Sequence, residues 1–161
     1  MNFKFIIFTI IIAFSFSAKA QNMTNESLEK ILYVLSDSIQ GKTGQWQFTI
    51  HNRVFICITD EYHNRMRIIT PIIEQDKLAY SELIRVLDAN FHTVLDVKYA
   101  LSDKILWSVF IHPLKELSKN QVISAVEQVY AAAATYGTTY TSTNLVFPST
   151  KTEKTSTVRK Q

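Results

Sequence analysis

Four histidines, one cysteine and a few close carboxylates are the side chains of this 161-residue chain that could do chemistry. The histidines are His51, His63, His92 and His112. A zinc site takes three or four nitrogen, sulfur or carboxylate ligands, often with one closely spaced pair. His92 and Asp96 are four residues apart, and they fall at a helix end and in the loop that follows. The spacing therefore favours turn and surface histidines, and we expect neither a metal nor another cofactor.

Cys57 is the only thiol, so the chain forms no intramolecular disulfide. It lies in the segment RVFICITDE, which is typical of a strand, and a free cysteine in a strand behaves as a small buried apolar residue. A thiol nucleophile needs exposure and a neighbouring base. Asp60 and Glu61 follow in a turn, where solvation accounts for them. We therefore expect no enzyme; a small exported enzyme using Cys57 and a histidine is the alternative.

The first twenty residues have the composition of a secretory signal peptide. Lys4 gives a positive start, Phe5–Phe16 is apolar throughout, and Ala18–Ala20 is a small-x-small cleavage site before Gln21. The apolar stretch is shorter than the ~20 residues that span a bilayer. We expect export to a periplasm or secretion, with no integral membrane span after cleavage.

One domain is expected over residues 21–147, followed by a Ser/Thr/Lys tail over 148–161 that has too little apolar surface to fold. Residues 21–150 carry eleven Lys and Arg against thirteen Asp and Glu, a formal charge of −2. The basic residues are interspersed with acids, whereas a nucleic-acid site gathers them on one face. We expect no nucleic-acid partner. A structural envelope protein that docks its tail to an anionic surface is a further alternative.

The first half of the domain reads as a helix followed by three strands. Helical spacing predicts a helix that starts at a Thr24 or Asn25 cap and continues to Gly41, through Leu28, Ile31, Leu32, Leu35 and Ile39. Alternating apolar residues then predict three strands, over Gln45–Ile50, Arg53–Thr59 and Arg65–Ile73. Pro71 cannot donate to a sheet ladder, so it indicates an edge or a bulge.

The second half reads as a helix, two strands and a helix. One apolar stripe predicts a helix capped by Asp76, with Tyr80, Leu83, Ile84, Leu87 and Phe91 in line. The strands lie within Asp96–Leu114, and the second, Ile105–His112, is apolar on both faces, so we expect it to be covered on both sides. The last helix has a capping box at Ser118 and Gln121, a hydrophobic staple at Leu117 and Val122, and a stop at Gly137.

This order of elements predicts a single α+β domain, helix, three strands, helix, two strands, helix, with helices packed on an antiparallel sheet. The order, together with four short motifs, resembles the fold family of class I type III secretion chaperones and YbjN-type domains. The motifs are Asn90-Phe91, Tyr99-Ala100-Leu101, Leu106-Trp107 and His112-Pro113-Leu114. The resemblance covers Leu28 to Tyr136. It implies a module that pairs as a homodimer, binds extended segments of other proteins and has no catalytic activity.

The second helix and the last two strands carry more aromatic and apolar surface than one helical layer can cover. An uncovered apolar patch usually marks an interaction site. We therefore expect a dimer face or polypeptide groove formed by Phe91, Tyr99, Leu106, Trp107, Phe110 and His112. The alternative is a core that Tyr140–Phe147 seals.

Overall fold

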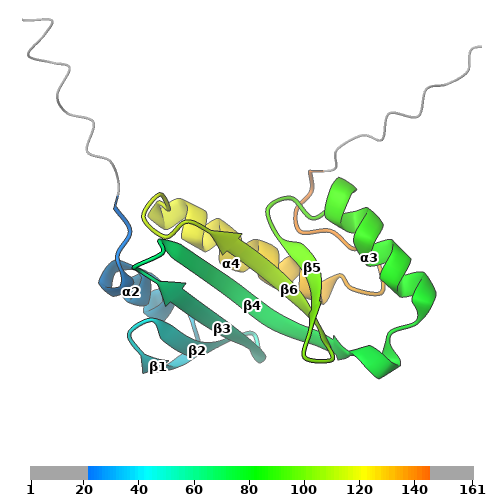
Figure 1. The fold of residues 1–161 in the computed structure, drawn as a ribbon, viewed down its shortest axis with the longest axis horizontal. Helices are drawn as coiled ribbons and strands as arrows, with labels where there is room; N and C mark the ends of the chain where they lie inside the picture. Colours follow the sequence, from blue (N-terminus) through cyan, green and yellow to red (C-terminus); the bar gives the residue numbers. More distant parts are fainter. Residues whose placement is uncertain (1–21, 146–161) are drawn as a thin grey trace, which may run out of the picture.

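A computed structural model describes residues 22–145, which form one six-stranded antiparallel sheet with three α-helices packed on it (Figure 1). The predicted α+β class is confirmed. The helices are α2 (Asn25–Leu35), α3 (Tyr80–His92) and α4 (Lys119–Ala134), with a 3-10 turn, η2, at Gln75–Lys77. The strands are β1 (Ser38–Lys42), β2 (Gln45–Ile50), β3 (Arg53–Asp60), β4 (Arg65–Glu74), β5 (Lys98–Ser102) and β6 (Ile105–His112).

The strand order is β1-β2-β3-β4-β6-β5, so the hairpin of the second half, β5–β6, adds to the edge formed by β4. Partners across an antiparallel ladder point to the same face. One row across the sheet joins Trp46, Cys57, Ile68 and Phe110, all buried beneath the helices. Pro71 lies at a register shift in the pairing of β4 with β6, which confirms the predicted bulge.

The first helix is shorter than predicted, and the sheet has one strand more. α2 ends at Leu35, and Ser36 turns the chain into an extended conformation at φ −97° and ψ 147°. Ile39, predicted to be helical, instead pairs with Phe48 as part of β1. Ile39 follows Leu35 by four residues, which is a helical spacing. The spacing is coincidental, because the chain turns at Ser36 and Ile39 belongs to the strand that follows.

Caps fix the starts of α2 and α4 as predicted. The Thr24 hydroxyl accepts from the Ser27 amide at 3.2 Å, and the Ser118 hydroxyl accepts from the Gln121 amide at 3.2 Å. The Gln121 side chain reaches back to the Ser118 amide at 2.8 Å, which completes the capping box. α4 ends earlier than predicted, at Ala134 rather than next to Gly137.

α3 starts later than predicted, and Asp76 is not its cap. Asp76 lies in η2, and the N-cap of α3 is Ala79, whose side chain has no acceptor atom. The side-chain hydrogen bond at this helix start comes from Glu82, whose carboxylate accepts from the Ala79 amide at 3.0 Å. Among the helices in residues 22–145, α3 therefore has the weakest start.

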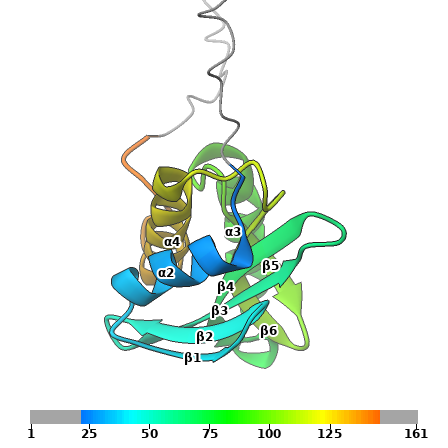
Figure 2. The ribbon, with the colours of Figure 1, turned by 90° about the vertical axis from the view of Figure 1, so that its left-hand side faces the viewer.

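The helices share one side of the sheet. α4 runs along β4 and β6, α2 packs against α4 and β1, and α3 lies beside the edge strand β5 (Figures 1 and 2). The core lies between α2, α4 and the sheet, and its largest fully buried side chains include Trp46, Phe48 and Phe55. The Trp46 indole nitrogen donates to Glu29 at 3.0 Å, which ties β2 to α2.

The residues after α4 close the core near β5. Tyr140 and Ser142 are buried, and the Leu95 amide donates to the Ser142 hydroxyl at 3.0 Å. The predicted leader, residues 1–20, and tail, residues 148–161, lie outside the described residues. Within 22–145, no helix combines the length and apolar character that crossing a membrane requires.

Candidate partner-binding surfaces

The six residues predicted to form a partner face do not lie on one surface. Tyr99, Leu106 and Phe110 are in the core of the subunit, and the Tyr99 hydroxyl donates to the Ala132 carbonyl at 2.7 Å. Phe91 is 79% exposed on α3. Trp107 and His112 are half-buried. Three of the six residues are therefore unavailable to a partner.

The alternation of β6 explains this division. Leu106, Ser108 and Phe110 point towards the helices, while Trp107 and Val109 point to the other face of the sheet. The sequence showed correctly that both faces are apolar. Within residues 22–145 only the helix side is covered, so the second cover that the sequence predicts for β6 is not supplied by this part of the chain. The segment 138–145 seals the helix side and leaves the other face open.

α3 turns most of its apolar stripe away from the core. Of the predicted stripe, only Leu83 is partly buried, and the residues that face the core are Val86 and Ala89. The exposed residues follow the helical spacing i, i+4, i+7, i+11, and we call them the outer stripe of α3: Tyr80, Ile84, Leu87 and Phe91. This periodicity was predicted from the sequence, but the direction in which the stripe faces was not.

The sheet face opposite the helices is apolar across three adjacent strands. Ile56 of β3 pairs with Ile69 of β4, which pairs with Val109 of β6. Each of these three is half-buried, and apolar residues flank them along β3 and β6. We call this surface the open face, formed by Val54, Ile56, Ile58, Ile69, Trp107, Val109 and Ile111. Its signal in the sequence is that β3 and β6 are apolar at consecutive positions.

The candidate nucleophile, Cys57, is buried. Cys57 lies on the helix side of β3 and is inaccessible to solvent, and its burial raises the pKa of the thiol to about 12. A thiol held protonated and out of contact with solvent cannot attack a substrate. The burial of Cys57 therefore gives no support to an enzyme that uses this thiol as its nucleophile. Burial also raises the pKa of Tyr99 to about 12.

The histidines are distributed over separate parts of the fold. His51 and His63 are in exposed turns, and the His63 imidazole lies 2.6 Å from the Asp60 carboxylate. Hydrogen bonds, first from the His63 backbone and then from its side chain, lower the pKa of Asp60. His92 is 3.7 Å from Asp88 rather than near Asp96. Within residues 22–145, no three His, Cys, Asp or Glu side chains are grouped closely enough to hold a metal ion.

Comparison with known structures identifies proteins with a similar fold. The chain is similar to the Yersinia pestis type III secretion chaperone SycH, solved in complex with a stable fragment of YscM2, with 20% identity and a TM-score of 0.53; the match covers 70% of this chain and 99% of that one. It is also similar to a chain of the HopA1–SchA chaperone–effector complex, with 13% identity and a TM-score of 0.52 over 68% and 88% of the two chains. The predicted resemblance to class I type III secretion chaperones is thus confirmed at the level of the fold. No family model and no curated protein matches the sequence.

Proposed function

We propose that this protein is an exported, non-enzymatic module that pairs with a second copy through the outer stripe of α3 and binds a polypeptide segment on its open face. The observation that carries the proposal is the outer stripe itself: four large apolar side chains exposed along one helix. Exposed apolar surface is costly in water, and contiguous patches usually mark interfaces. The chaperone-like fold supports a binding role, since both similar structures are complexes with another polypeptide.

The outer stripe suits a two-fold symmetric pair. Tyr80 to Phe91 spans about 16 Å at 1.5 Å per residue, long enough for two α3 helices to pack side by side. A two-fold axis through the middle of the stripe brings Tyr80 opposite the second copy's Phe91 and Ile84 opposite its Leu87, large against large and medium against medium. No charged residue belongs to the stripe, so pairing buries no unpaired charge there.

The open face favours an apolar segment that carries a carboxylate. Arg67 is exposed between Ile58 and Ile111, its register partners on β3 and β6. A carboxylate of the bound segment would pair with the Arg67 guanidinium, while apolar side chains would cover the isoleucines. The open face and α3 are separate surfaces, so pairing and segment binding can occur together.

Light scattering coupled to size-exclusion chromatography tests the pairing. We expect a dimer for the wild type and a monomer for Leu87→Asp, because two carboxylates would be buried opposite Ile84. Ser81→Asp places the same charge on the polar side of α3 and should remain dimeric. Circular dichroism shows whether each variant is folded. A wild type that is monomeric at its highest soluble concentration would refute pairing through α3.

Export depends on residues 1–20, outside the described part of the chain, and has its own test. We expect cells that express the full chain to accumulate a form that begins at Gln21 outside the cytoplasm, as read by fractionation and intact mass. Full-length chain confined to the cytoplasm would refute export and leave the binding proposal untouched.

A further inference from the structure

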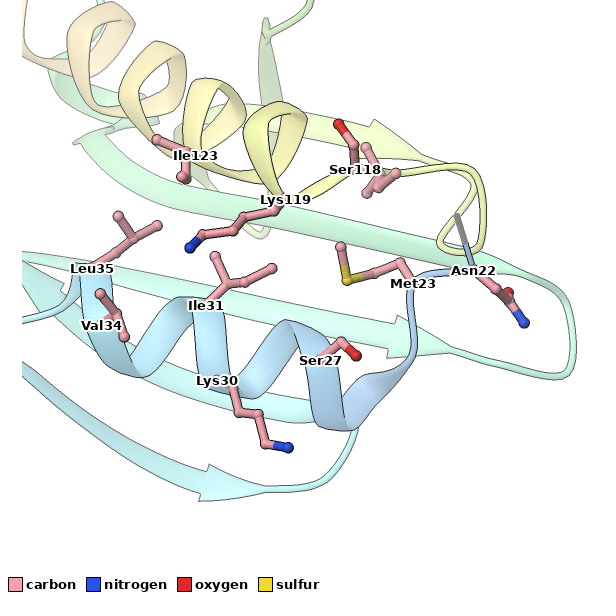
Figure 3. Close-up of a pocket in the computed structure, with 11 residues that line it drawn as sticks. Asn22, Met23, Ser27, Lys30, Ile31, Val34, Leu35, Ser118, Lys119 and Ile123 are labelled. Atoms are coloured by element: carbon pink, nitrogen blue, oxygen red, sulfur yellow. The ribbon is translucent and has the colours of Figure 1, made fainter. Parts of the chain in front are cut away.

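A groove lies between α2 and α4, on the helical layer and away from both surfaces described above. Its volume is about 590 Å³, within the range of about 300–1,000 Å³ typical of small-molecule sites. Figure 3 shows α2 and the start of α4 as its two walls. Its apolar lining comes from Met23, Ile31, Val34, Leu35, Leu117 and Ile123. The side of α4 that forms this wall is therefore not fully covered by α2.

The charge of the groove is positive. Its lining includes two ammonium groups, Lys30 and Lys119, and no carboxylate. Lys30 is engaged with Glu26 at 2.7 Å. Lys119 extends across the groove above Ile31 (Figure 3), and no carboxylate of residues 22–145 lies within 4 Å of it. An anionic group can therefore approach Lys119 without displacing a partner.

The N-terminus of α4 adds positive potential at one end of the groove, whereas the first turn of α2 contains Glu26. Ser118, the N-cap of α4, lines the groove, and Ser27, in the first turn of α2, lines the same end (Figure 3). The first turn of α4 contains no acidic residue. The partial positive charge of a helix N-terminus favours an anion there. The groove therefore combines a free ammonium group, which lies over the apolar side chains of Ile31 and Leu35, with the N-terminus of α4 at its other end.

The walls of the groove favour an acyl chain over an extended peptide. Beyond their first turns both walls are helices, whose backbone groups are hydrogen-bonded internally. An extended peptide lying between them would leave its own amides and carbonyls unpaired in apolar surroundings, which is unfavourable. An acyl chain has no such groups, and each methylene group that it buries makes the free energy of binding more favourable.

We propose that the groove between α2 and α4 binds a long-chain fatty acid, with its carboxylate at Lys119 and its acyl chain along Ile31, Val34 and Ile123. This inference goes beyond the binding function proposed above. It depends on neither pairing through α3 nor export, and its failure would leave both intact.

Titration calorimetry of the full chain with laurate, methyl laurate and dodecylamine tests the proposal. Laurate should bind with 1:1 stoichiometry, its affinity should exceed that of octanoate, and the neutral ester and the amine should bind at least tenfold more weakly. Equal affinity for laurate and dodecylamine would overturn the role of Lys119, and with it the proposal.

Two matched pairs of variants locate the site. Val34→Asp places a carboxylate at the rim of the groove and should reduce laurate affinity at least tenfold, whereas Tyr33→Asp, on the neighbouring exposed residue outside the groove, should leave it within twofold. Lys119→Glu should abolish binding, and Lys115→Glu, also exposed but outside the lining, should not. Lys119→Glu is expected to fold normally, because an acid in the first turn of a helix is favourable.

Two further outcomes would overturn the proposal. One is laurate binding that Val34→Asp and Lys119→Glu leave unchanged while both variants remain folded by circular dichroism. The other is a full chain that binds no laurate and in which Ile11→Cys forms a disulfide with Val34→Cys, which would assign the groove to the chain's own leader. Cys57 does not interfere with that measurement, because it is buried.

Discussion

The two faces of the sheet have similar composition and opposite surroundings. On the helix side, Phe48 and Phe55 stack with ring centroids 5.2 Å apart, and side chains from all three helices join the core. On the open face, Ile58 and Ile111 are exposed although they are as apolar as the residues beneath the helices. The apolar pattern of a strand therefore indicates which faces favour burial. The packing of the helices determines which of those faces is buried within the subunit.

The helices α3 and α4 show the same contrast. α4 buries seven residues, among them Ala125, Ala132 and Ala133, whose small side chains let it lie close to the sheet. α3 buries only Val86 and Ala89, and exposes its large residues. In α4 small residues such as Ala125 and Ala132 point inward, whereas in α3 the large apolar residues point outward. The predictions below test this division.

The largest contrast is expected in thiol reactivity. Cys57 should stay inert to a thiol reagent until the chain unfolds, because the reagent meets only the unfolded fraction, on the order of 10⁻³ to 10⁻⁶. The variant Cys57→Ala/Ile58→Cys moves the thiol by one residue to the open face. In its native state this thiol should react as fast as the thiol of the unfolded control. Rapid labelling of native Cys57 would show that the helix side is not closed.

A core truncation on β6 should cost far more than a matched truncation on the open face. Leu106→Ala removes a fully buried side chain, and we expect a loss of about 2–5 kcal/mol in the free energy of unfolding. Ile111→Ala, on the same strand, should change it by less than about 0.5 kcal/mol. Urea titrations followed by circular dichroism, at a protein concentration low enough to dissociate any dimer, measure both. Equal costs would mean that the open face is covered.

Alkaline pH should lower the free energy of unfolding through groups that are buried on the helix side of the sheet. The pKa of Cys57 is raised from 9.0 to about 12, so the fold favours the protonated thiol. This contribution is fully present below pH 9 and is lost as pH rises towards 12. Cys57→Ala should therefore show a shallower fall in unfolding free energy across that range. Its fall should not vanish, because Tyr99, with its pKa also raised to about 12, contributes in the same direction.

The smallest effects concern the two helix starts. Ser118→Ala should destabilise the protein by about 1 kcal/mol, since it removes the acceptor for the Gln121 amide. Ala79→Ser supplies the acceptor that α3 lacks and should stabilise it by a similar amount. Thermal unfolding of the two variants measures both signs. A stabilising Ser118→Ala would contradict the capping box.

Local signals in the sequence determined much of the fold. The capping box at Ser118 and Gln121, the alternation in β2 to β4, the apolar run of β6 and the bulge at Pro71 rest on interactions within a few residues, so they were predictable. β1 was not, because a five-residue edge strand has little periodicity and its spacing matched the preceding helix. The buried state of Cys57 was also predicted, because its neighbours in β3 are apolar.

Tertiary structure alone decided where the apolar surfaces point. Six aromatic and apolar residues near the last hairpin read as one face in the sequence, yet Leu106 and Phe110 entered the core while Trp107 faced the other side of the sheet. The sequence predicts one apolar stripe on α3, but the residues that the structure buries are Val86 and Ala89, and most of the stripe is exposed. Which side of a two-sided apolar element is covered depends on where distant segments pack, and no local pattern carries that information.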